Sequence, residues 1–163
     1  MSMINFFKIK KACPPMRQGI SVIEMLIVIT VLGIIFSIVI PQFSKSREMQ
    51  VLRSGVADIL SSMDKARGET LSSFNSSSYG VHFQSDKIII FKGTVFSALD
   101  VNNETINIVT PASISNIALV GGGSDFYFNR LSGSPSTTGM VTISTPSYSK
   151  TITIYATGVI SSN

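Results

Sequence analysis

The longest feature of the hydrophobic pattern is an apolar stretch from Ile20 to Ile40. As an α-helix rising about 1.5 Å per residue, these 21 residues would extend for roughly 31 Å, which matches the hydrocarbon core of a bilayer. Glu24 is the one ionisable residue within the stretch. Because apolar residues cover every face, the pattern is typical of a membrane-spanning helix and differs from the one-sided pattern of a soluble helix. We therefore predict a transmembrane helix over residues 20–40.

The pattern changes after Pro41, where apolar residues recur at spacings of three and four. Polar residues fall on the opposite face, and Lys65 stands four residues before Glu69, a spacing that favours a helical ion pair. The apolar stripe consists of Leu52, Val56, Ile59, Leu60, Met63, Leu71 and Phe74. One long helix is therefore expected from about Ile20 to Phe74, and the stripe of its amphipathic half, residues 41–75, is expected to pack on the chain's own sheet.

Short alternating runs follow a break at Asn75-Ser76-Ser77-Ser78. They predict strands, and two pairs of them flank Ser85-Asp86 and Pro146-Ser147, which indicates two hairpins. The expected strands cover residues 79–84, 87–92, 105–108, 114–120, 126–128, 140–145 and 150–155. Strands that follow a single helix define an α+β fold, in which the long N-terminal helix packs on a C-terminal antiparallel β-sheet head, residues 76–163.

Charge is unevenly distributed along the 163 residues. Thirteen Lys and Arg residues exceed nine Asp and Glu residues, but four of the basic residues precede residue 20, so the rest of the chain is balanced. These four are Lys8, Lys10, Lys11 and Arg17. A basic segment before an apolar helix predicts a cytoplasmic amino end, although Lys45 and Arg47 follow on the far side. The balanced remainder gives no reason to expect a nucleic-acid partner.

Two other kinds of N-terminal segment combine basic residues with an apolar run. A cleaved secretory signal would have a shorter run without a carboxylate and would end in a small-x-small site, which Pro41-Gln42-Phe43-Ser44 does not supply. A lipoprotein signal would place an apolar stretch before its cysteine, whereas Cys13 follows Ile9-Lys10-Lys11-Ala12. Because Cys13 is the only cysteine, an internal disulfide is excluded.

Glu24 requires a partner, because a charge near the middle of a membrane helix costs about 2.5–3.5 kcal/mol, and less near the end. Cleavage after Gly19 would make Glu24 the fifth residue of a chain that begins with a free amine at Ile20. The amine of a neighbouring copy, shifted along the helix axis, would then neutralise the carboxylate, and this attraction would be much stronger in lipid than in water.

Residues 18–24, followed by the apolar helix, resemble the type IV prepilin processing motif: Gln18-Gly19-Ile20-Ser21-Val22-Ile23-Glu24. The resemblance implies that a prepilin peptidase removes the leader, residues 1–19, and methylates the new amine of Ile20. It also implies that Glu24 is a determinant of methylation and assembly. Ile20 replaces the commoner Phe, and a leader of 19 residues is longer than many, so the start could be Met1, Met3 or Met16.

Two further features extend the resemblance. Gly33 and Pro41 lie at offsets where pilin helices often carry Gly and Pro, which loosen the helix. The order Asp125-Phe126-Tyr127-Phe128-Asn129, a Gly/Ser/Pro-rich turn through Gly139, two strands and Gly158 resembles the H-type minor pseudopilin of type II secretion and related type IV minor pilins. That family commonly has an Arg after the last Gly, where this chain has Val159.

The resemblance implies a minor pseudopilin, a structural subunit of the periplasmic pseudopilus of a type II protein secretion system. Its partners would be other pilin-like subunits bound through the N-terminal helix, the prepilin peptidase and an inner-membrane assembly platform. It would cross the bacterial inner membrane once, with a cytoplasmic N-terminus and a periplasmic head, before entering the filament. The alternative is a minor pilin of a type IV pilus, acting in assembly initiation or DNA uptake.

Patterns that carry catalysis or bind ions are weak in this sequence. His82 is the only histidine and lies in a predicted strand, and no nucleophile elbow surrounds a serine. Gly121-Gly122-Gly123 precedes neither a helix nor a lysine and predicts a turn. Residues 100–104 carry oxygen ligands but lack the glycine of an EF-type calcium loop, so a solvated turn is predicted. We expect no enzymatic activity, no cofactor and no bound metal.

Overall fold

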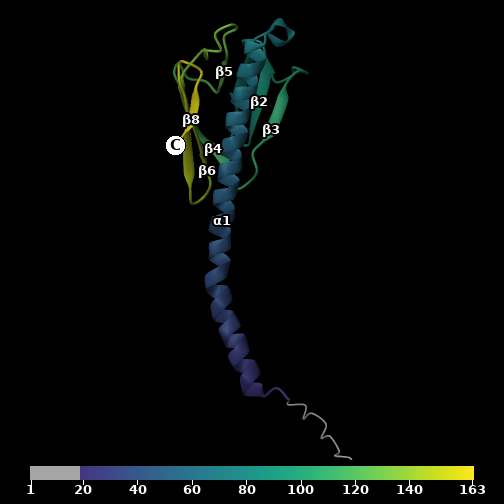
Figure 1. Cartoon of the computed structure of the whole chain (residues 1–163), viewed down its shortest axis with the longest axis vertical. Coiled ribbons are helices and arrows are strands. Elements are labelled where there is room, and N and C mark those ends of the chain that lie inside the picture. The colour runs from purple at the N-terminus through teal and green to yellow at the C-terminus, as the bar shows by residue number, and fades with distance from the viewer. Residues whose placement is uncertain (1–18) are drawn as a thin grey trace, which may run out of the picture. The chain divides into compact units, whose positions relative to one another are not determined.

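The computed structural model describes residues 19–163, and the predicted leader lies outside them except for Gly19. A 50-residue helix, α1 (Val22–Leu71), is followed by a short 3₁₀ helix, η1 (Phe74–Ser76), and by the strands (Figure 1). The strands are β1 (Tyr79–Phe83), β2 (Lys87–Lys92), β3 (Glu104–Asn107), β4 (Ser113–Leu119), β5 (Asp125–Tyr127), β6 (Gly139–Ser144), β7 (Ser149–Ile154) and β8 (Ile160–Ser162). The chain divides into two compact units, Met1–Val39 and Ile40–Asn163.

The strands of the second unit form two antiparallel sheets of four strands each. The first sheet has the order β3-β2-β1-β5 and the second has the order β4-β6-β7-β8. The α+β class is therefore confirmed, but the prediction of one sheet was wrong. The chain leaves the first sheet after β3, returns to it for β5 and leaves it again for β6. Alternation of apolar residues marks the buried face of a strand but does not say which strand it pairs with, so the pattern could not separate the two sheets.

Both predicted hairpins are confirmed. β1 pairs with β2 from Tyr79 opposite Lys92 onward, and the backbone N–H of Gln84 donates to the carbonyl of Lys87 at 2.9 Å to close the turn. β6 pairs with β7 in the same antiparallel manner. β8 was not predicted, because its three residues are too few to show a period.

The core of the second unit is shared by α1 and both sheets. In Figure 1, the C-terminal half of α1 runs between β2 and β3 on one side and β4, β6 and β8 on the other. Buried phenylalanines and isoleucines from the two sheets meet the buried face of the helix. That face consists of Leu52, Gly55, Val56, Ile59, Ser62, Met63, Ala66 and Thr70. The structure thus confirms that the amphipathic half packs on the chain's own strands.

The predicted apolar stripe is wrong at its C-terminal end. Leu71 is 45% exposed and Phe74 is 54% exposed, whereas the small residues Ala66 and Thr70 are buried. Close approach of the helix to the strands favours small residues on this face. A Cβ atom added to Gly55 would lie 2.5 Å from Cδ1 of Ile143 in β6, closer than packed carbon atoms allow.

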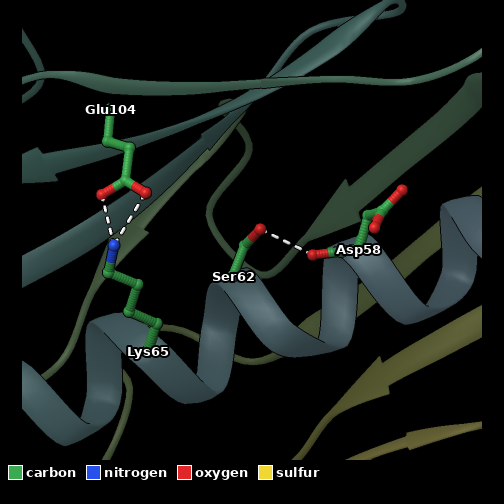
Figure 2. Close-up of polar contacts among 4 residues, drawn as sticks. All are labelled: Asp58, Ser62, Lys65 and Glu104. Atoms are coloured by element: carbon green, nitrogen blue, oxygen red, sulfur yellow. Dashed lines mark hydrogen bonds and ion pairs between the residues drawn. The ribbon is translucent and has the colours of Figure 1, made fainter.

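Polar contacts tie α1 to the strands at two positions. The Oγ1 of Thr70 donates to the carbonyl of Ala66 at 2.8 Å and accepts a hydrogen bond from the backbone N–H of Tyr79 at 2.9 Å, so it joins the end of α1 to the start of β1. The Nζ of Lys65 lies 2.7 Å and 2.5 Å from the two carboxylate oxygens of Glu104 in β3 (Figure 2). This ion pair takes the place of the predicted pair with Glu69, and hydrogen bonding to Glu104 raises the pKa of Lys65.

Candidate functional site

The predicted processing site lies immediately before the first turn of α1. Gly19 and Ile20 are exposed and precede the helix, which begins at Val22. The carbonyl of Ser21 accepts a hydrogen bond from the backbone N–H of Met25 at 3.1 Å, so Ser21 occupies the N-cap position. The peptide bond between Gly19 and Ile20 is therefore outside the helical hydrogen-bond ladder.

Glu24 lies in the first turn of α1 and is exposed. Within residues 19–163, the charged contacts are Lys65 with Glu104 and His82 with Asp125, so the Glu24 carboxylate has no ion-pair partner in this part of its own chain. A negative charge in the first turn is favourable to the helix dipole, by about 0.3–1 kcal/mol at exposed sites. Glu24 therefore stabilises the start of the helix, and its carboxylate is accessible to a cationic group of another molecule.

Ser21 and Glu24, which belong to the predicted processing motif, also match a pattern that starts helices. Ser at the N-cap and Glu three residues later is the spacing of a capping box. In that motif the Ser side chain accepts a hydrogen bond from the backbone N–H of the Glu, and the Glu side chain accepts one from the backbone N–H of the Ser. The structure places both residues at these positions. The Ser-x-x-Glu pattern was visible in the sequence and would have predicted the helix start close to Val22.

The apolar part of α1 is exposed along its whole length. Every residue from Gly19 to Arg47 is exposed, and the apolar side chains among them contact no core of their own unit. This helix is long and apolar enough to cross a membrane, with no part of its apolar window buried. Length and composition are therefore compatible with a single-pass membrane anchor.

Gly33 and Pro41 lie inside α1, which continues through both positions. Pro41 has no backbone N–H, so it cannot donate to the carbonyl of Ser37 one turn earlier. A Cβ atom at Gly33 would meet nothing within 4 Å. Thr30 donates its Oγ1 to the carbonyl of Leu26 at 2.8 Å, which satisfies the hydroxyl without a second helix. The predicted flexibility at Gly33 and Pro41 stays a prediction.

His82 lies in a strand, β1, as predicted, and its side chain is 13% exposed. Its ring stacks on Phe96 with centroids 3.8 Å apart, and Nδ1 lies 3.7 Å from Oδ1 of Asp125 and 3.5 Å from Oγ of Ser124. A Ser-His-acid triad needs the serine and the acid on opposite ring nitrogens, whereas both contacts here meet Nδ1. Burial lowers the pKa of His82, against the opposite effect of the Asp125 carboxylate.

The two loops considered for ion or phosphate binding are turns. Oδ1 of Asp100 accepts hydrogen bonds from the backbone and side-chain nitrogens of Asn102 at 2.9 Å and 2.7 Å, and these bonds lower the pKa of Asp100. Glu104, at the other end of this segment, binds Lys65. Gly122 donates to the carbonyl of Leu119 at 3.0 Å, and residues 121–123 all have positive φ. The described residues contain no group of three acidic, His or Cys side chains placed to hold a metal ion.

Comparisons of the chain with models of protein families, with curated proteins and with solved structures found no match. The chain's own residues therefore carry the evidence for its function. Among these, Gly19, Ile20 and Glu24 are grouped at one end of α1 by their sequence spacing, and Gly33 and Pro41 lie further along the same helix.

Proposed function

We propose that this protein is a pilin-like filament subunit, and specifically a minor pseudopilin of a type II protein secretion system. The observation that carries the proposal is the exposed apolar part of α1, which begins three residues after Gly19 and contains Glu24 as its single ionisable residue. An apolar helix of this length needs lipid or other helices around it. A filament core supplies the same kind of surroundings after the subunit leaves the membrane.

Processing at Gly19 fits the local backbone. A peptidase binds its substrate in an extended form, and the bond between Gly19 and Ile20 precedes the first helical turn. Hydrolysis of this bond by a prepilin peptidase would leave an amine on Ile20, four residues before Glu24. The amine of one subunit and the Glu24 carboxylate of the next would then form an ion pair in apolar surroundings, which would fix the axial offset between neighbouring helices.

Residues 76–163 of the second unit would form the periplasmic head, which packs on the amphipathic half of α1. Its core joins the amphipathic half of α1 to both sheets, so a force applied to the helix would reach the head through buried contacts. The protein would therefore act structurally, with other pilin-like subunits and an inner-membrane assembly platform as its partners. Val159 follows Gly158 where the H-type family commonly has Arg, which weakens the likeness to the H-type head but not to pilins in general. The alternative is a minor pilin of a type IV pilus. Loss of exoprotein secretion in a deletion strain would support the pseudopilin, and loss of pilus assembly or of DNA uptake would support the alternative.

The experiment that tests the proposal compares Glu24→Ala with the matched control Glu69→Ala, a second glutamate of α1 far from the apolar part. We expect Glu24→Ala to be cleaved nearly as well as the wild type but to enter filaments poorly, because its neighbour's amine has no partner. Glu69→Ala should enter normally. Filament entry is measured by crosslinking to other subunits and by recovery in sheared filament fractions. Normal entry of Glu24→Ala would contradict the pairing mechanism.

A further inference from the structure

Two clefts flank α1 directly after its apolar part, and each contains a cationic side chain. One cleft, of about 930 Å³, is lined by Lys45 and other residues spaced three and four apart on one helix face, with Tyr148 on its far side. The other, of about 370 Å³, is lined by Arg47 of the helix and by Pro111 of the head. Each cleft thus holds at least one cationic side chain beside the head, and the cleft of Arg47 also holds the carboxylate of Glu48.

Neither cation is neutralised by a carboxylate in the described residues 19–163. Glu48, which also lines the cleft of Arg47, accepts a hydrogen bond on Oε2 from the backbone N–H of Ser147 at 3.1 Å. That bond directs a carboxylate oxygen of Glu48 to the turn between β6 and β7. Lys45 and Arg47 are both exposed, and their donors are open to an anionic ligand.

The positions of the two cations along α1 suit the headgroup layer of a bilayer. The apolar stretch ends at Ile40, and at 1.5 Å per residue Lys45 and Arg47 follow it by about 8 Å and 11 Å. The polar layer on each side of the hydrocarbon core is roughly 5–8 Å thick, and the long side chains of Lys and Arg can extend toward it. Arg53, which lines the same cleft as Lys45, follows Ile40 by about 20 Å and lies beyond that layer.

We propose that Lys45 and Arg47 bind the phosphate groups of anionic phospholipids on the head side of the membrane and so set the depth of the helix. This inference rests on the proposed function, because it requires the apolar part of α1 to cross the membrane. Basic residues are normally scarce on the side to which a head is exported, so two at this place call for a specific role. An ammonium and a planar guanidinium are both suited to phosphate oxygens. Each cation near an anionic surface strengthens binding by roughly fivefold.

The test uses the full-length protein, reconstituted in phosphatidylcholine vesicles that contain a minor share of phosphatidylglycerol. The protein is re-extracted in mild detergent, and both lipids are quantified per protein by mass spectrometry. We expect the wild type to retain phosphatidylglycerol well above its share in the vesicles. Lys45→Gln/Arg47→Gln should lower this enrichment by about tenfold or more. The matched control Arg53→Gln/Lys92→Gln removes the same charge outside the headgroup layer and should stay within about twofold of the wild type.

Several results would overturn the proposal. One is equal phosphatidylglycerol enrichment in the wild type and Lys45→Gln/Arg47→Gln. Another is an equal loss of enrichment in Lys45→Gln/Arg47→Gln and in the control Arg53→Gln/Lys92→Gln, which would indicate that the lipid is attracted by the total charge of the protein. Displacement of the lipid by millimolar inorganic phosphate would indicate a site for free phosphate. Lys45→Gln/Arg47→Gln is also crosslinked in pure phosphatidylcholine vesicles. If its copies crosslink less than those of the wild type there, while its phosphatidylglycerol enrichment in the mixed vesicles is unchanged, the cations belong to a protein contact.

Failure of this inference and failure of the proposed function give different results. The same vesicles are washed with alkaline carbonate, which removes peripheral proteins and leaves spanning proteins in place. Release of the protein by carbonate would contradict the membrane-spanning role. A protein that remains in the vesicles without enriching phosphatidylglycerol would contradict the lipid site alone.

Discussion

At the scale of single residues, the proposed function gives Glu24 two effects, which one substitution would remove together. Its carboxylate lies in the first turn of α1, three residues after Ser21, and it has no ion-pair partner among residues 19–163 of its own chain. Support of the helix start is a local effect of about 0.3–1 kcal/mol. The proposed pairing with a neighbouring amine would be an intermolecular effect in apolar surroundings.

Ser21→Ala separates these two effects, because it weakens the helix start without removing the charge of Glu24. We expect Ser21→Ala to enter filaments as the wild type does, with a loss of helix stability of about 1 kcal/mol. Circular dichroism of the full-length protein in detergent measures the helix, and subunit crosslinking measures entry. If Ser21→Ala were as defective in entry as Glu24→Ala, the role of Glu24 would be helix capping and not pairing.

The hydroxyl of Thr70 provides a second residue-scale prediction. Thr70→Val keeps the shape of the side chain but leaves the buried N–H of Tyr79 without the acceptor that it now has at 2.9 Å. An unsatisfied buried donor costs about 1–3 kcal/mol. Urea unfolding of the full-length protein in detergent, followed by circular dichroism, should show a decrease of this size. Ser72→Ala, at an exposed hydroxyl near the same helix end, serves as the control and should change the free energy of unfolding by less than about 0.5 kcal/mol.

The third residue-scale prediction concerns pH. Burial lowers the pKa of His82, so the folded protein holds the neutral ring while the unfolded chain binds a proton near the ordinary pKa of about 6.5. The stability from this group is therefore complete above about pH 6.5 and is lost as the pH falls from that value through the lower pKa of the folded state. Asp125 acts in the opposite direction and limits the effect.

We expect the melting temperature to fall between about pH 7.5 and pH 5.5, and to fall less in His82→Gln. The difference between the two proteins isolates the histidine from the other titrating groups. A steeper fall in His82→Gln than in the wild type would mean that Asp125 outweighs burial.

At the scale of elements, two glycines of α1 provide a matched test of how closely the helix approaches the second sheet. A Cβ atom at Gly55 would lie 2.5 Å from Cδ1 of Ile143, whereas a Cβ atom at Gly68 would meet nothing within 4 Å. Gly68→Ala should stabilise the protein by about 0.5–1 kcal/mol through helix propensity. Gly55→Ala should be less stable than Gly68→Ala by about 1–3 kcal/mol, because the buried side chain of Ile143 must move. Equal stabilisation by both changes, measured by urea unfolding, would contradict the close packing.

The sequence predicted local elements better than their assembly. Alternation and turn residues located both hairpins, because strand faces and tight turns are determined by neighbouring residues. The division into two sheets depends on pairing between distant strands such as β1 and β5, which no local pattern reports. The apolar stripe failed at Leu71 and Phe74 for a related reason. Burial there is decided by how near the strands lie, and the structure places Ala66 and Thr70 against them.

The candidate site was more accessible to sequence reasoning than the sheets were. Gly19, Ile20 and Glu24 are within six residues, so their grouping at the start of α1 follows from their short separation in the sequence. The capping position of Ser21 could also have been read from the sequence. The clefts beside Lys45 and Arg47 could not, because Tyr148 and Pro111 reach them only through the fold of the head.

At the scale of the whole molecule, the two parts of α1 differ in their surroundings. Its first part is exposed and apolar, and its second part supplies one face of a core that also takes residues from both sheets. The exposed apolar surface of the first part is compatible with a membrane or with a filament of similar helices around it. This surface is the physical basis of the proposed role as a pilin-like subunit.

The most direct measurement is the intact mass and the N-terminal peptide of the protein purified from membranes of cells that process other prepilins. The proposed function predicts a chain that lacks residues 1–19 and begins with N-methylated Ile20. A protein that retains those residues, or one cut at a bond other than that between Gly19 and Ile20, would contradict it.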